Sequence, residues 1–109
     1  MAYDEKLADR IRKRFGKRKG IVEKKMFGGI AFLLNGHMCC GVFKETMIVR
    51  LPPEESDAAL AEPHTGVFDF TGRPMRGWIV VQPKGVATDG QLGKWVERSS
   101  RHAASKPPK

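Results

Sequence analysis

The sequence of 109 residues contains no uninterrupted apolar run of about 18 residues, the length that a membrane-spanning helix requires. Its first residues are charged, and the apolar core of a signal peptide does not follow them. Cysteine is scarce, since the only two are the neighbours Cys39 and Cys40. Adjacent residues of a strand point to opposite faces of a sheet, so we expect these thiols to be poor disulfide partners. Together these absences predict a cytoplasmic protein without a membrane segment.

The usual groupings of metal ligands and catalytic residues are also missing. His37 and Cys39 share one predicted strand face, and His64 or His102 could join them, but a zinc site normally draws its ligands from paired clusters. Cys39 is a better candidate nucleophile than Cys40, but a nucleophilic thiol needs a base and an electropositive, accessible setting. We therefore expect buried thiols and a structural histidine. The same reasoning predicts no metal, no cofactor, no small-molecule substrate and no enzyme activity.

Positive charge, in contrast, is abundant and unevenly placed. The formal net charge is +8, and residues 1–25 carry ten Lys/Arg against four acids, while residues 94–109 carry five against one. Basic ends of this kind attract polyanions, and nucleic acid is the commonest polyanion in the cytosol. The alternative is that these side chains serve only solubility. The candidate phosphate contacts are Arg10, Arg12, Lys13, Arg14, Lys17, Arg18, Lys19, Arg73, Arg76, Arg98 and Arg101.

Arg73 and Arg76 belong to this set because they lie close to Trp78. Arginine beside tryptophan can stack on a base or hold a phosphate. The structural alternative is that Trp78 fills the core while the arginines bond to turn carbonyls or to Asp69. The sequence leaves both interpretations open.

The strongest local signal is Asn35-Gly36, which stands between two apolar runs and favours a two-residue hairpin turn. Such a turn would pair Leu34 with His37, Phe32 with Cys39 and Ile30 with Gly41. A second reversal at Lys44-Glu45 would pair Phe43 with Thr46. Alternation then predicts an entirely apolar core face, made of Ala31, Leu33, Met38, Cys40, Val42, Met47, Val49 and Leu51.

The opposite face of these predicted strands is apolar but carries a few polar groups. A bare patch of that size would be unusual, so helices, a second subunit or a ligand should cover it. The residues that we expect to offer a partner surface there are Phe32, His37, Phe43, Ile48 and Arg50.

The remaining segments complete an α+β pattern. Apolar residues recur every four positions from Tyr3 to Phe15, which predicts a helix that Gly16 ends. Further helices are predicted from Pro52 to Leu60 and after Thr88, whose spacing to Gln91 matches a capping box. Short strands are predicted at 22–27, 67–70 and 78–81. The expected fold is a mostly antiparallel sheet of about five strands with flanking helices, in the order α-β(3)-α-β(2)-α.

Three pieces of the chain together resemble the N-terminal domain of the TfoX/Sxy family of bacterial competence regulators. They are the run Lys25-Met26-Phe27-Gly28-Gly29, the strand pair that ends near Val49-Arg50, and the block Phe68-Asp69-Phe70-Thr71-Gly72-Arg73-Pro74-Met75-Arg76-Gly77-Trp78. The resemblance covers residues 3 to 100 and implies helices flanking a mostly antiparallel sheet. Full-length members are linked to DNA uptake and to transcription of competence genes, and they carry a second, C-terminal domain. The family offers no catalytic motif.

The resemblance implies a stand-alone version of this domain at residues 1–103, followed by a disordered basic tail at 104–109. We expect a small, non-enzymatic regulatory domain that acts through weak, non-specific nucleic-acid contact or through a transcription-regulator protein bound to nucleic acid. The alternative is a protein-interaction module or homodimer that uses the face of Phe32, Phe43 and Ile48.

Overall fold

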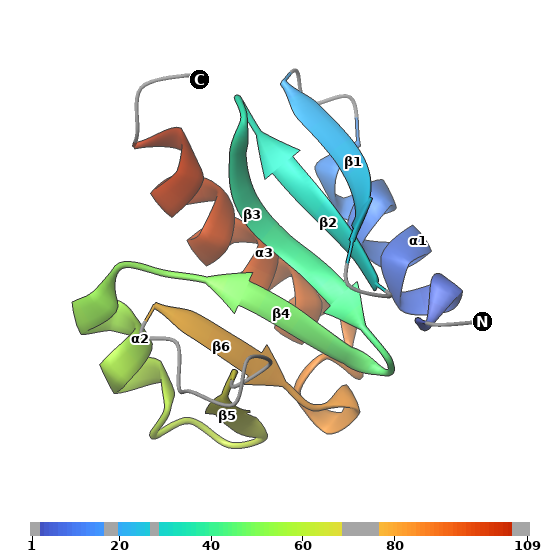
Figure 1. Ribbon diagram of the computed structural model, residues 1–109. Coiled ribbons are helices and arrows are strands. Elements are labelled where there is room, and N and C mark those ends of the chain that lie inside the picture. The colour runs from blue at the N-terminus through green and yellow to red at the C-terminus, as the bar shows by residue number, and fades with distance from the viewer. Residues whose placement is uncertain (1–2, 17–19, 27–28, 69–76, 106–109) are drawn as a thin grey trace.

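A computed structural model describes residues 3–16, 20–26, 29–68 and 77–105. The helices and strands follow one another as α1 (Glu5–Phe15), β1 (Ile21–Met26), β2 (Gly29–Leu34), β3 (His37–Phe43), β4 (Thr46–Arg50), α2 (Pro53–Ala59), β5 (Thr65–Val67), β6 (Trp78–Val81), the short 3₁₀ helix η1 (Pro83–Gly85) and α3 (Asp89–Ala104). The six strands form one antiparallel sheet in the order β1-β2-β3-β4-β6-β5. The predicted α+β class is confirmed, with four strands rather than three before α2 (Figure 1).

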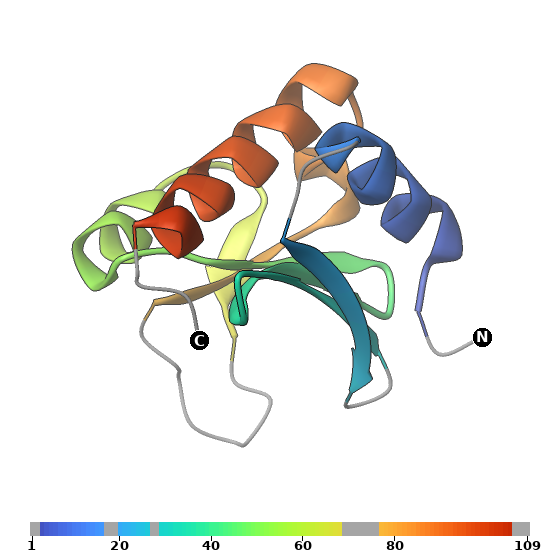
Figure 2. The ribbon, with the colours of Figure 1, turned by 90° about the horizontal axis from the view of Figure 1, so that it is seen from above.

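The helices gather on one side of this sheet. Figure 2 shows α1 and α3 side by side over one face, with α2 at the margin near the C-terminal end of α3. None of the described helices covers the opposite face. In the part of the chain that the structure describes, no helix is long and apolar enough to cross a membrane.

Helix α1 ends before Gly16 as predicted, but it begins at Glu5 rather than Tyr3, which forms an isolated bridge with Lys44. The Asp4 carboxylate accepts hydrogen bonds from the backbone N–H groups of Lys6 and Leu7, at 2.9 and 3.2 Å, which satisfies two otherwise unpaired donors. Gly16 ends the helix with φ 60°, a conformation that costs glycine little. The buried side chains of α1 are Leu7, Ala8, Ile11 and Phe15.

Helix α3 begins with the predicted capping box. The Thr88 hydroxyl accepts from the Gln91 N–H at 3.1 Å, and the Gln91 side chain accepts from the Thr88 N–H at 3.0 Å. Its apolar residues, Trp95 and Val96 among them, face the sheet and are buried. Ala104, predicted to begin the disordered tail, is the last residue of α3, and residues 106–109 lie outside the described part of the chain.

Both predicted reversals of the central sheet are confirmed. Asn35 and Gly36 have φ values of 53° and 87°, as a turn with two left-handed residues requires. Lys44 occupies the second turn with φ 56°, and Phe43 pairs with Thr46 as expected. The sequence signal was weaker there because no glycine is present.

The predicted register of β2 and β3, however, is wrong beyond the pairs next to the turn. Leu34 pairs with His37 as predicted, but Phe32 lies opposite Cys40 rather than Cys39, and Ile30 lies opposite Val42 rather than Gly41. A β-bulge causes the shift, because Cys39 is one extra residue on β3 between the partners of Leu33 and Phe32.

Because of the bulge, the two faces of β2 are the reverse of those predicted. Phe32 is 0% exposed beneath α1, where its ring centroid lies 5.8 Å from that of Phe15, so its assignment to the partner face is wrong. Ala31, Leu33 and Met38, predicted for the core face, lie on the helix-free face instead. The residues of the sheet beneath the helices, with Leu51 directly after β4, are Ile30, Phe32, Leu34, Cys39, Cys40, Val42, Met47, Val49, Leu51, Ile79 and Val81.

The strand predicted at residues 67–70 is also displaced. The structure places β5 at Thr65–Val67, at the edge of the sheet beside β6. Phe68 follows the strand, and residues 69 and 70 lie outside the described part of the chain.

Candidate nucleic-acid interface

The predicted phosphate-binding residues divide between two helices and two undescribed segments. Helix α1 carries Arg10, Arg12, Lys13 and Arg14, and α3 carries Arg98 and Arg101. Three further residues at 17–19, together with Arg73 and Arg76, fall outside the described residues. The structure therefore describes six of the predicted cations.

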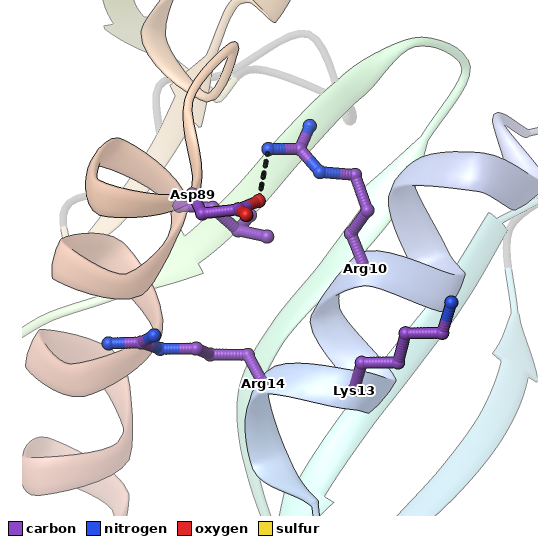
Figure 3. A pocket seen from close by; sticks show the side chains of 5 residues that line it. Arg10, Lys13, Arg14 and Asp89 are labelled. Atoms are coloured by element: carbon purple, nitrogen blue, oxygen red, sulfur yellow. Dashed lines mark hydrogen bonds and ion pairs between the residues drawn. The ribbon is translucent and has the colours of Figure 1, made fainter.

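A surface pocket of about 220 Å³ lies between α1 and the start of α3, lined by Arg10, Lys13, Arg14, Asp89 and Leu92. In Figure 3 the Arg10 and Arg14 side chains reach from α1 toward α3, one helical turn apart, whereas Lys13 lies along α1. Arg10 Nη2 is 3.5 Å from Asp89 Oδ1, a long contact with a carboxylate that is 94% exposed. Three cations and one carboxylate thus line this pocket, and Lys13 Nζ also lies 3.2 Å from Asp9.

Arg14 is held against α3 at a position where that helix has no side chain. A Cβ atom built at the buried Gly93 would lie 2.5 Å from Arg14 Nη2 and 2.6 Å from Arg14 Cζ. The guanidinium therefore rests on the helix backbone at Gly93. Sequence analysis did not assign a role to Gly93, because a glycine inside a helical pattern marks a close approach without naming what approaches.

Arg12 is committed to a contact inside the molecule. Its Nε and Nη2 atoms lie 2.7 and 2.6 Å from the two carboxylate oxygens of Glu23 in β1, and Nη1 lies 3.3 Å from Asp9. The hydrogen bond to Glu23 raises the pKa of Arg12 and lowers the pKa of the Glu23 carboxyl. This bidentate pair ties α1 to the edge of the sheet, so Arg12 is a weaker candidate for phosphate contact than Arg10 and Arg14.

Arg98 is likewise engaged within the fold. Its Nη1 atom donates to Glu62 at 2.8 Å, Lys94 Nζ donates to the same carboxylate at 2.9 Å, and both cations lie over the Trp95 ring, at 4.7 and 4.8 Å. Arg101 is exposed and lines a second pocket with His102 and residues of α2. Arg98 lines the same pocket, so the two arginines lie together as the sequence grouped them, and the hydrogen bond of Arg98 to Glu62 is what distinguishes them.

Only some of the residues predicted for the partner face lie on the helix-free face of the sheet. Phe43, Ile48 and Arg50 lie on the helix-free face, where the Arg50 guanidinium stands 5.3 Å from the Trp78 ring centroid. The Trp78 ring in turn lies 6.2 Å from the Phe68 ring. His37 is half-buried at the hairpin end, opposite Leu34. Half-buried apolar side chains thus remain on this face at Leu33, Met38, Phe43, Trp78 and Val80.

Both cysteines point to the helix-covered side, because the bulge turns Cys39 there as well. Cys39 Sγ lies 3.4 Å from the Ser99 hydroxyl and 3.6 Å from that of Ser100, and both thiols are 0% exposed. The predicted arrangement on opposite faces is wrong. A hydrogen bond with Cys39 and burial raise the pKa of the Cys40 thiol well above its usual value. Among the described residues, no group of three or more histidines, cysteines and carboxylates is placed to hold a metal ion.

These features define a small α+β domain with a cationic helical side and an apolar sheet side. The family model described as the TfoX N-terminal domain matches residues 13–103, and the chain belongs to this family. It is therefore a competence-regulator-like domain. No curated protein and no solved structure matches the chain.

Proposed function

We propose that this protein is a non-enzymatic regulatory domain that acts through the phosphate backbone of nucleic acid, alone or together with a nucleic-acid-bound protein partner. The observation that carries the proposal is that Arg10, Lys13 and Arg14 all line one pocket whose single carboxylate, Asp89, lies 3.5 Å from Arg10. Lys17, Arg18 and Lys19 follow directly in the sequence and add three positive charges to this part of the chain.

Contacts of this kind recognise phosphates and carry no direct base information. Arginine and lysine neutralise backbone charge and release counterions, so binding weakens steeply as salt rises. The described cations lie on the surfaces of α1 and α3, where they can neutralise backbone phosphates. We therefore expect weak binding without sequence preference.

The test is fluorescence anisotropy with a labelled DNA duplex at two salt concentrations. The triple variant Arg10→Ala, Lys13→Ala, Arg14→Ala should bind about tenfold more weakly at low salt, and its slope of log affinity against log salt should be shallower by about two to three. The matched control is Lys24→Ala, Lys25→Ala, Lys84→Ala, which removes as much charge from exposed sites elsewhere. Equal losses in both variants would mean that only net charge matters, and no binding at low salt would exclude direct contact.

The helix-free face of the sheet favours a second candidate function, a homodimer. Val22 is 59% exposed and lies in line with Leu33 and Met38 across β1, β2 and β3, and Phe43 and Trp78 are half-buried on the same face. A second copy of the chain would remove this apolar surface from water. In that case the basic helical side would serve solubility.

A further inference from the structure

The helix-free face of the sheet carries two pairs in which a cation lies beside an aromatic ring. The Arg50 guanidinium stands 5.3 Å from the centroid of the Trp78 ring. Lys44 Nζ stands 5.6 Å from the centroid of the Phe43 ring. Trp78 lies opposite Arg50 at the end of β4, whereas Phe43 lies opposite Thr46 at its start. The two pairs therefore stand at opposite ends of the same strand.

The spacing of the two rings follows from the register. Thr46 and Arg50 are four residues apart on β4, which corresponds to about 13 Å of strand. Phe43 lies one strand to one side of β4 and Trp78 one strand to the other. With about 4.8 Å between neighbouring strands, these two residues are about 16 Å apart across the sheet. A short single strand of nucleic acid can reach both, because its sites on OB-fold proteins span about 4–16 nucleotides.

The charge of this face complements a polyanion. Among the strand residues that the structure describes there, the charged side chains are Lys24 and Arg50, and none is acidic. In the β3–β4 turn Lys44 lies beside Phe43, and the exposed Glu45 follows it. A second copy of the chain would bring two sets of these cations together, whereas the phosphates of a nucleic acid neutralise them.

We propose that the helix-free face binds single-stranded nucleic acid, with unpaired bases stacking on the Arg50–Trp78 pair and on Phe43. All three side chains are half-buried, so each keeps surface that a base can cover. The Phe68 ring lies 6.2 Å from the Trp78 ring and widens the aromatic surface. Bases stack on aromatic rings and on guanidinium planes, and this contact tolerates any sequence. In a duplex the base faces already stack on one another, so the surface selects single strands.

This surface lies on the side of the sheet opposite α1, so the site does not depend on the proposed phosphate contacts there (Figure 2). It also differs from them in chemistry, because it contacts the bases as well as the backbone. An oligomer that has the phosphates but lacks the bases therefore separates the two kinds of binding.

The experiment compares an oligothymidylate of about 12 nucleotides with an abasic oligomer of the same length. Affinities are measured by fluorescence anisotropy of the labelled strands, and stacking by quenching of tryptophan fluorescence. Trp95 is 2% exposed, so quenching reports on Trp78. We expect quenching by the oligothymidylate and an affinity at least about fivefold higher than that of the abasic oligomer, as one stacked base predicts.

Two variants connect this preference for bases to the helix-free face. Trp78→Ala should reduce the preference to within about twofold, and Arg50→Gln should lower it by about threefold. Lys84→Gln is the matched control, since it removes one exposed charge in η1, outside this face, and should leave the preference unchanged. Circular dichroism checks the fold of each variant, and Arg50→Gln carries the test if Trp78→Ala does not fold.

No binding of the oligothymidylate, equal affinity for the two oligomers, or a preference that Arg50→Gln and Trp78→Ala retain in full would overturn the site. A wild type that is dimeric and does not bind the oligothymidylate would assign the face to a second copy, which also overturns it. The triple variant of Arg10, Lys13 and Arg14 should keep the preference for bases. If that variant also keeps its affinity for the abasic oligomer, the proposed phosphate contact on α1 fails while this site stands.

Discussion

A single extra residue in β3 decides the chemistry of Cys39. Without a bulge, Cys39 would share the helix-free face with Gly41 and Phe43. In the structure Cys39 is the inserted residue, and its thiol lies beneath α3 with the hydroxyls of Ser99 and Ser100. Those hydroxyls also donate to backbone carbonyls of α3, so the sulfur is surrounded by groups that are already satisfied.

We predict that both thiols react slowly in the folded protein. Each side chain is 0% exposed and the pKa of Cys40 is raised, so the nucleophilic thiolate is rare and shielded. Labelling with a thiol-reactive dye should be slower by about a thousandfold or more than in denaturant, because it waits for the fold to open.

The Cys39→Ala variant is the control that assigns the remaining signal to Cys40. Rapid labelling of either thiol under native conditions would contradict the burial and would reopen the interpretation of Cys39 as a nucleophile.

At the scale of elements, the polar contacts of α3 are concentrated on one acidic residue. Glu62 follows α2 and accepts hydrogen bonds from Lys94 and Arg98, which fixes the α2–β5 segment to the helix. Burial acts to raise the pKa of Glu62, but these hydrogen bonds outweigh it and lower the pKa below the usual glutamate value. The network thus links two segments that are more than 30 residues apart in sequence.

Glu62→Gln should lower the free energy of unfolding by about 1 kcal/mol at pH 7, as expected for a partly exposed network of two charged hydrogen bonds. Because the folded pKa is the lower one, the stabilisation is complete above the unfolded value of about 4.3 and is lost as the pH falls through the folded pKa. Urea unfolding of both proteins from pH 7 to pH 2 measures the difference.

In the same series, Glu54→Gln is the control, since it neutralises an exposed carboxylate on the neighbouring α2. If the wild type and Glu62→Gln still differ by the same amount at pH 2, ionisation of Glu62 is not the source of the stabilisation.

The whole molecule is two-sided, with the described helices over one face of the sheet and none over the other (Figure 2). The helical side carries the pocket of Arg10 and Arg14, and the sheet side carries apolar and aromatic residues. The two candidate functions therefore use opposite sides of the molecule, and a dimer through the sheet would leave two cationic sides free for nucleic acid.

For the homodimer candidate, light scattering of the wild type should give about 24 kDa, twice the 12.2 kDa of one chain. Phe43→Asp places a charge on the proposed interface and should return the mass to that of one chain, because an unpaired buried charge is costly. Val67→Asp is the matched control, since Val67 is 46% exposed at the β5 edge. A wild type that stays monomeric at every concentration would reject the homodimer.

The sequence by itself determined the local features of this protein. Asn35-Gly36, the Asp4 and Thr88 caps and Gly16 each act within a few neighbouring residues, so their conformations follow from local chemistry. The α+β class followed from the order of these segments. The basic character of α1 was equally visible, because net charge is a property of composition.

Only the tertiary structure decided which faces and which cations are available. No glycine or turn pattern in the sequence marks the bulge at Cys39, since it depends on how β3 packs against α3. The shift in register that it causes places Phe32 in the core. Arg12 and Arg98 look equivalent to Arg10 in the sequence, but distant carboxylates hold Arg12 and Arg98 at 2.6 and 2.8 Å, whereas Asp89 meets Arg10 only at 3.5 Å. Gly93 gained its role only when α1 came to lie beside it. Contacts between segments distant in sequence decide which of several locally equivalent side chains are engaged, and the local sequence does not contain that information.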